Sequence, residues 1–231
     1  MQELAKADPT PHTRFNDAKC DSHGRLWCGT MALDATVGDQ GAFYCYAGGK
    51  ITFNDHHFPV TCNRRNPFVI TGKLTKHVSP VSISNGIVWS NDNKTMYYND
   101  SLPKKVYKFD YREDDGTISN QQVFVDYTKD DAFGNPDGMC SDKEGRLWIA
   151  SFGGSGGINC WDPQTGEHLR RILIPGASNV TSCCFGGPNF EWLLVTSARI
   201  RQDPSKYPNA GNVFVVKGLG VQGNPAPRFK L

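Results

Sequence analysis

Residues 138–152 read GMCSDKEGRLWIASF, and residues 19–31 read KCDSHGRLWCGTM. Both carry the phrase GRLW, and in both an apolar strand runs into a turn rich in Gly or Asp before a second strand returns. Two further stretches have the same form without the phrase: GIVWSNDNKTMYYNDS at 86–101 and CCFGGPNFEWLLVTSA at 183–198. Four copies of one strand–turn–strand unit indicate an internal repeat.

A polar residue stands just ahead of each copy. These residues are Asn16-Asp17, Asn85, Asp137 and Ser182. If the four copies are equivalent units of a radially symmetric fold, equivalent positions converge on its axis. The sequence therefore predicts one site built from these residues, although they are widely separated along the chain.

The spacing of the copies predicts the fold class. Tyr97 and Trp148 hold the same place in two copies and lie 51 residues apart, and Leu193 follows Trp148 by 45 residues. After each copy comes a second aromatic or β-branched run that ends in a Gly-bearing turn: GAFYCYAGGK, KVYKFDYREDDG, GINCWDPQTGEH and GNVFVVKGLG. A repeat of this length with several short strands is typical of a β-propeller blade. A β-sandwich with coincidental turn spacing is the alternative.

One interval is longer than the others. Trp27 and Tyr97 are 70 residues apart, and the surplus falls between two repeats. We predict a single domain over residues 1–231 with an insertion loop at 52–74. This segment contains the pair His56-His57, but adjacent residues on a strand point to opposite faces, so an exposed loop is favoured over a metal site.

The composition excludes several classes of protein. The chain has 25 basic and 23 acidic residues, a net charge of +2, and no charge runs. We expect no nucleic-acid partner and no membrane partner. No signal peptide or membrane span is evident, so we expect a cytoplasmic protein. The eight cysteines include no CxxC pair and are expected to act as small buried hydrophobic residues rather than as zinc ligands or disulfides.

Several motifs together resemble the SMP-30/gluconolactonase/luciferin-regenerating enzyme family. They are RFNDAKCDSHGRLWCGTM, SISNGIVWS, NPDGMCSDKEGRLWIASF, TSCCFGG and GNVFVVKGLGVQG. The resemblance runs from about Arg14 to Val221 and omits the surplus segment. It implies an all-β fold of the six-bladed β-propeller class, of which this chain would supply about four to four and a half blades. Relative to the family the chain is expected to be N-terminally truncated, without the Glu-Ser-Pro motif whose Glu is a third metal ligand.

The resemblance also implies roles for individual residues. Asn85 of the SNG motif and Asp137 of the PDG motif match metal ligands, and Asp137 also matches the catalytic proton acceptor. Arg14 and Asn16 match residues that contact substrate. Asp34, a few positions after GTM, matches an acidic substrate contact. The implied cofactor is one divalent cation, Ca²⁺ or Zn²⁺, with Mg²⁺ and Mn²⁺ also compatible with oxygen ligands.

The resemblance therefore implies a metal-dependent hydrolase of sugar lactones, a carboxylic ester hydrolase of the gluconolactonase type. The cation would polarise the lactone carbonyl, and Asp137 would act as general base toward water. The expected partner is a small-molecule lactone, and the complete family member is expected to be a monomer. Two alternatives remain open: a non-catalytic calcium-binding regulatory protein, and an enzyme of the luciferin-regenerating type.

Overall fold

The computed structural model describes residues 5–7, 12–53 and 68–230. Its strands form four antiparallel sheets, and helical structure in the described part is limited to two 3-10 turns, η1 (Tyr127–Lys129) and η2 (Asp131–Phe133). The predicted all-β class is therefore confirmed.

Each predicted repeat corresponds to one sheet in which the strands follow chain order. The first sheet contains β1 (Thr13–Cys20), β2 (Leu26–Ala32), β3 (Gly41–Phe53) and β4 (Phe68–Val81); the second β5 (Ser84–Trp89), β6 (Thr95–Asp100), β7 (Lys105–Arg112) and β8 (Thr117–Asp126); the third β9 (Asn135–Ser141), β10 (Leu147–Phe152), β11 (Gly157–Trp161) and β12 (His168–Ile172); the fourth β13 (Val180–Gly186), β14 (Trp192–Ser197) and β15 (Val213–Val216).

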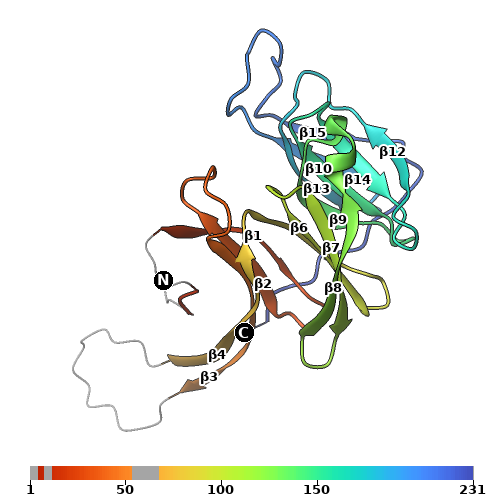
Figure 1. Ribbon diagram of the computed structural model, residues 1–231. Helices are drawn as coiled ribbons and strands as arrows, with labels where there is room; N and C mark the ends of the chain where they lie inside the picture. The colour runs from red at the N-terminus through yellow and green to blue at the C-terminus, as the bar shows by residue number, and fades with distance from the viewer. Residues whose placement is uncertain (1–4, 8–11, 54–67, 231) are drawn as a thin grey trace, which may run out of the picture.

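The four sheets are arranged as blades of a β-propeller (Figure 1). The first strands of successive sheets contact one another, β1 with β5, β5 with β9, and β9 with β13. These four strands are the inner strands of the blades. The predicted propeller architecture is therefore confirmed, and the polar residue of every repeat lies on an inner strand.

The repeated GRLW phrase belongs to a turn built around a buried carboxylate. Asp21 is completely buried, and its Oδ1 accepts hydrogen bonds from the backbone N–H groups of His23 and Arg25, both at 3.0 Å. Its Oδ2 accepts from Arg25 Nε at 2.6 Å and from Trp27 Nε1 at 3.0 Å. Gly24, with φ of +82°, supplies the left-handed residue that this tight turn needs. The spacing of Asp, Arg and Trp therefore follows from one carboxylate that accepts from Arg25 and Trp27, and the glycine allows the turn between them.

The third blade repeats this arrangement. Asp142 is completely buried and accepts from Arg146 Nε at 2.7 Å and from Trp148 Nε1 at 2.9 Å. Gly145 has the same φ of +82° as its counterpart in the first blade. The sequence identity of the two copies thus reflects identical hydrogen bonding rather than a shared catalytic role.

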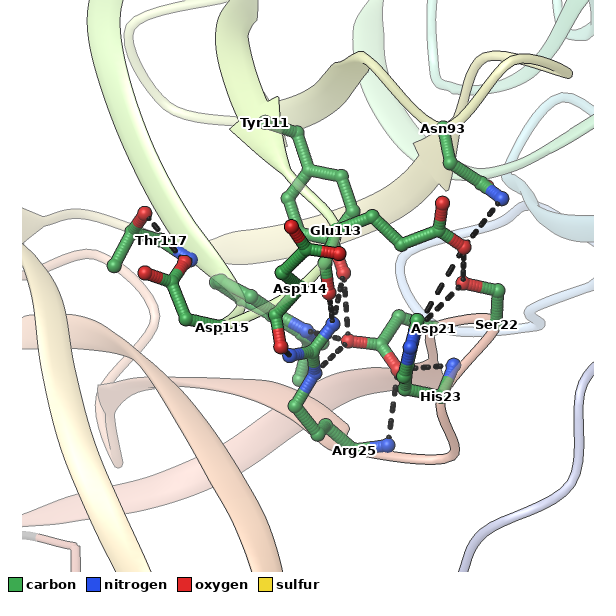
Figure 2. A network of polar contacts seen from close by, with 11 residues as sticks. Asp21, Ser22, His23, Arg25, Asn93, Tyr111, Glu113, Asp114, Asp115 and Thr117 are labelled. Atoms are coloured by element: carbon green, nitrogen blue, oxygen red, sulfur yellow. Dashed lines mark hydrogen bonds and ion pairs between the residues drawn. The ribbon is translucent and has the colours of Figure 1, made fainter.

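In the first blade the same turn also reaches the next blade (Figure 2). Arg25 donates to Tyr111 Oη at 2.8 Å and to the backbone carbonyl oxygens of Glu113 and Asp114 in the β7–β8 turn. Burial alone would raise the pKa of Asp21, but hydrogen bonds from Trp27, Arg25 and Tyr111 lower this pKa below its usual value. The ionised Asp21 and Arg25 therefore link the first two blades.

Aromatic side chains fill the spaces between blades. Trp27 is completely buried and lies with its ring centroid 5.4 Å from Phe43 and 6.0 Å from Tyr111 of the second blade. Trp148, also completely buried, meets Phe185 of the fourth blade edge-on at 5.8 Å. Large side chains such as these supply most of the apolar area buried between sheets. The core is thus a series of inter-blade layers rather than one central cluster.

The surplus segment differs from the expected loop where the structure describes it. The pairing of β3 with β4 continues outward to Thr52↔Val69 and Phe53↔Phe68, so residues 52–53 and 68–74 are strand. The β-branched and aromatic residues of ITF and FVIT favour such a ladder. His56 and His57 lie outside the described residues. His77 is described, and its ring packs 4.8 Å from Trp27, which is a core contact.

The described cysteines are free thiols. Cys28, Cys45, Cys140, Cys160 and Cys183 are buried, as expected for small hydrophobic side chains. In the described part of the chain, no helix is long and apolar enough to cross a membrane.

Candidate functional site

Each inner strand is irregular at its polar residue. The regular pairing with the second strand skips a short stretch of every inner strand. The skipped residues are Asn16 and Asp17 in β1, Asn85 and Gly86 in β5, Asp137 and Gly138 in β9, and Thr181 in β13. A bulge of this kind redirects side chains away from the regular alternation of a strand. Four equivalent bulges therefore turn polar side chains toward one region.

That region is a cavity of about 530 Å³ at the inner strands. Its polar wall consists of Arg14, Asn16, Asp17, Asn85, Ser101, Asn135, Asp137, Thr181, Ser182 and Arg201, and its apolar wall includes Met31, Ile83, Leu102, Phe152 and Ile200. The convergence predicted from the repeat is therefore observed. In the fourth blade the residue in the bulge is Thr181, one position before the predicted Ser182, and both line the cavity.

A directed series of hydrogen bonds connects the first blade to the second. Arg14 donates to Asn16 Oδ1 at 2.9 Å, and Asn16 Nδ2 donates to Asn85 Oδ1 at 3.2 Å and to Ser84 O at 2.8 Å. Asn85 Nδ2 then donates to Ser101 Oγ at 2.8 Å. Arg14 and Asn16, matched to substrate contacts, are thus physically connected to Asn85, matched to a metal ligand.

Two carboxylates occupy the same cavity wall. Burial and the nearby charge of Asp17 raise the pKa of Asp137 to about 8, against a weaker opposing hydrogen bond from the Gly138 backbone. Burial also raises the pKa of Asp17, although Lys19 acts in the opposite direction. Lys19 itself donates to Met139 O on β9 at 2.7 Å. Burial and the charge of Asp17 therefore favour the neutral form of Asp137 unless a cation compensates that charge.

Close backbone approach fixes where Asp137 lies. Asn99 Nδ2 donates to Asp137 O at 2.6 Å. A Cβ at Gly86 would lie 2.7 Å from that oxygen, and a Cβ at Gly138 would lie 2.3 Å from Ser182 Oγ. The glycines of the SNG and PDG motifs are thus required for the inner strands to approach each other, in addition to any role in a turn.

Asp34 has a different environment from the other predicted site residues. Its side chain is exposed, and its Oδ1 accepts from Thr36 N at 2.9 Å and from Thr36 Oγ1 at 2.7 Å. These hydrogen bonds, with a smaller contribution from Arg201, lower the pKa of Asp34. The neighbouring Ala35 lines the cavity, whereas Asp34 caps its own loop. Its substrate contact therefore stays a prediction that rests on the resemblance.

The donor set at the cavity fits a hard divalent cation. Asp17 and Asp137 offer carboxylate oxygens, and Asn85 offers an amide oxygen. Within the described ranges, no three or more His, Cys, Asp or Glu side chains are grouped so that they could hold a metal ion. The donors that line the cavity are oxygen atoms of two acids and one amide, which suit Ca²⁺ or Mg²⁺ better than a metal that prefers nitrogen and sulfur. The like-charged acids need positive charge between them to be ionised together.

Sequence reasoning did not assign a role to several of these residues. Asp17 is among the polar residues predicted to converge at the site but has no role of its own in that prediction, and its charge acts on Asp137 from another blade. Ser101 and Arg201 come from loops outside the repeated inner-strand position. The position of Ser101 directly after β6, at the end of a copy of the repeat, was the available signal.

Comparisons with known proteins agree on one family. A family model described as the SMP-30/Gluconolactonase/LRE-like region matches residues 1–199. Regucalcin of Danio rerio is 39% identical over 96% of this chain and 68% of its own length. A solved luciferin-regenerating enzyme is 36% identical, with a TM-score of 0.78, over 95% of this chain and 66% of its own. A calcium-binding protein, regucalcin, from Agrobacterium tumefaciens is 29% identical, with a TM-score of 0.79, over 96% and 66%. The chain spans about two thirds of the length of each.

Proposed function

We propose that this chain, which belongs to the SMP-30/Gluconolactonase/LRE-like family, functions in divalent-cation-dependent hydrolysis of sugar lactones. The observation that carries the proposal is the pair of carboxylates, Asp17 and Asp137, beside the oriented amide of Asn85 in one cavity. A cavity of about 530 Å³ lies within the usual range for small-molecule sites. Its polar and apolar walls suit a compact, hydroxylated ring.

A divalent cation bound by Asn85, Asp137 and Asp17 would act as a Lewis acid toward the lactone carbonyl. Asp137 is the general base in this proposal, because an ionised carboxylate can take a proton from the attacking water. With a pKa raised to about 8 by burial and the charge of Asp17, Asp137 would need compensating positive charge to be ionised at neutral pH. The same residues therefore bind the ion and prepare the base.

Arg14 and Asn16 would bind and orient the sugar ring. The Arg14 side chain is exposed at the cavity and keeps N–H donors beyond those bonded to Asn16 and Phe15. Charge-assisted donors at this position would stabilise negative charge that develops on the substrate. Phe152 at the end of β10 and Ile200 after β14 form apolar wall of the cavity and would exclude water from one side of the ring.

The test is hydrolysis of a δ-lactone by the purified chain, followed by proton release, with and without a chelator. We expect activity that the chelator abolishes, added Ca²⁺ or Mg²⁺ restores, and Asp137→Asn reduces at least about a hundredfold. The exposed Asp110→Asn on β7 is the matched control and is expected to retain activity. Activity that survives the chelator, or that survives Asp137→Asn, would refute the mechanism.

The second candidate is calcium binding without catalysis. It is favoured by the 29% identical structure described as a calcium-binding protein. Calorimetric titration with Ca²⁺ separates the two functions: binding without hydrolysis of any lactone supports this candidate. A luciferin-regenerating type of activity, suggested by the 36% identical structure, would show as turnover of a heterocyclic substrate in place of a lactone.

A further inference from the structure

Ser101 lies between two blades and contacts both. It follows β6 directly and is 6% exposed. Its Oγ donates to the backbone carbonyl of Pro136 at 2.6 Å and accepts from Asn85 Nδ2 at 2.8 Å. Pro136 directly precedes Asp137, so one hydroxyl links the Asn of the second blade to the chain beside the Asp of the third.

The direction of these hydrogen bonds follows from which atoms can donate a proton and which can only accept one. A carbonyl oxygen can only accept, so the single proton of the Ser101 hydroxyl points at Pro136 O. Ser101 Oγ can then only accept from its other neighbour. The part of the Asn85 amide that faces Ser101 must therefore be the NH₂ group. The amide oxygen, Oδ1, consequently faces the opposite way, toward Asn16 on β1.

The neighbouring amide is fixed by the same logic. Asn16 Nδ2 faces Ser84 O, which only accepts, and Asn16 Oδ1 faces the Arg14 guanidinium, which only donates. Asn16 therefore presents its NH₂ group to Asn85 Oδ1. This hydrogen bond occupies one of the two lone-pair directions of Asn85 Oδ1. The other direction is available to a ligand in the cavity.

We propose that Ser101 is a positioning residue that holds the Asn85 amide with its oxygen toward the bound cation. This inference rests on the proposed function, because it assigns Ser101 a role at the same ion. If the amide were rotated by half a turn, its oxygen would face the acceptor lone pairs of Ser101, and its NH₂ group would face both Asn16 and the cation. Ser101 makes that arrangement unfavourable without contacting the ion.

Comparing Asn with Asp at residue 85 separates the positioning role of Ser101 from ordinary packing. An amide has one oxygen and must be oriented, whereas a carboxylate presents oxygen in either orientation. Ser101→Ala should therefore weaken cation binding when residue 85 is Asn. The same change should have little effect in the Asn85→Asp background. A merely structural hydroxyl would matter equally in both.

The experiment measures Ca²⁺ affinity by calorimetry in four variants of the full chain. We expect Ser101→Ala to raise the Kd about tenfold, and the same change in the Asn85→Asp background to raise it less than about threefold. Ser151→Ala is the matched control, because Ser151 is also buried and accepts from Asn159 Nδ2 at 2.6 Å but does not line the cavity. It should lower the thermal midpoint comparably and leave the Kd within about twofold.

Two results would overturn the proposal: an equal loss of affinity in both backgrounds, or no loss in either. A wild-type chain that binds no Ca²⁺ would instead refute the proposed function. In that case the orientation is decided by NMR of the Asn85 side-chain NH₂ group, whose solvent exchange should be slow in the wild type and faster in Ser101→Ala. Equal exchange in both proteins would exclude the orienting hydrogen bond.

Discussion

The raised pKa of Asp137 predicts that protons and the cation compete for the site. With a pKa of about 8, only about one Asp137 carboxyl in ten is ionised at pH 7 in the absence of a cation. A cation that requires the ionised form should then bind about tenfold more weakly at pH 7 than at pH 9, and about a further tenfold more weakly at pH 6. Above pH 8 the affinity should level off.

The same pKa predicts how stability depends on pH without the cation. The folded-state pKa of Asp137 is raised above its ordinary value of 3.8, so the folded chain binds a proton that the unfolded chain has lost between pH 4 and 8. The associated stability is fully present below pH 4 and is lost as pH rises through about 8, at no more than about 1.4 kcal/mol per pH unit. A saturating cation should reduce or reverse this slope.

Calorimetry in two buffers of different ionisation enthalpy measures the competition directly. At pH 7 each bound Ca²⁺ should release about 0.9 proton, and at pH 9 about 0.1. Asp17→Asn removes the second charge, so it should lower the proton release at pH 7 and raise the Kd at pH 9 about tenfold. The exposed Asp110→Asn should change neither quantity. Ca²⁺ binding with no proton release at pH 7 would refute the raised pKa of Asp137 and the effect of the Asp17 charge on it.

Three further changes test other parts of the structure. Asp21→Asn leaves the buried Arg25 without its charge partner. It should lower the free energy of unfolding, measured in urea, by about 3–5 kcal/mol. A loss below about 1 kcal/mol would contradict the inter-blade link. Gly86→Ala places a methyl group 2.7 Å from Asp137 O, so it should cost about 1–3 kcal/mol and weaken Ca²⁺ binding, and unchanged affinity would show that the strand spacing is not critical. Arg14→Ala should raise the KM for a lactone about tenfold. Its thermal midpoint should stay close to that of the wild type, because the Arg14 side chain is exposed. An unchanged KM would exclude Arg14 from the substrate site.

The sequence by itself predicted the propeller class and the convergence of Asn16, Asn85 and Asp137. Both followed from a repeat, since a structural unit that recurs along the chain places equivalent residues in equivalent positions around an axis. The GRLW phrase was also informative, because its Asp, Gly, Arg and Trp are local neighbours whose hydrogen bonds close within one turn.

Only the tertiary structure showed how these residues interact across blades. Arg25 meets Tyr111 at a separation of 86 residues, and Ser101 meets Pro136 at a separation of 35. The charge of Asp17 acts on Asp137, and the hydroxyl of Ser101 orients Asn85. The spacing of these residues along the chain does not predict that they lie close together. A repeat specifies which residues share a position, whereas pKa values and hydrogen-bond polarity depend on which side chains the packed blades bring within a few ångströms of one another.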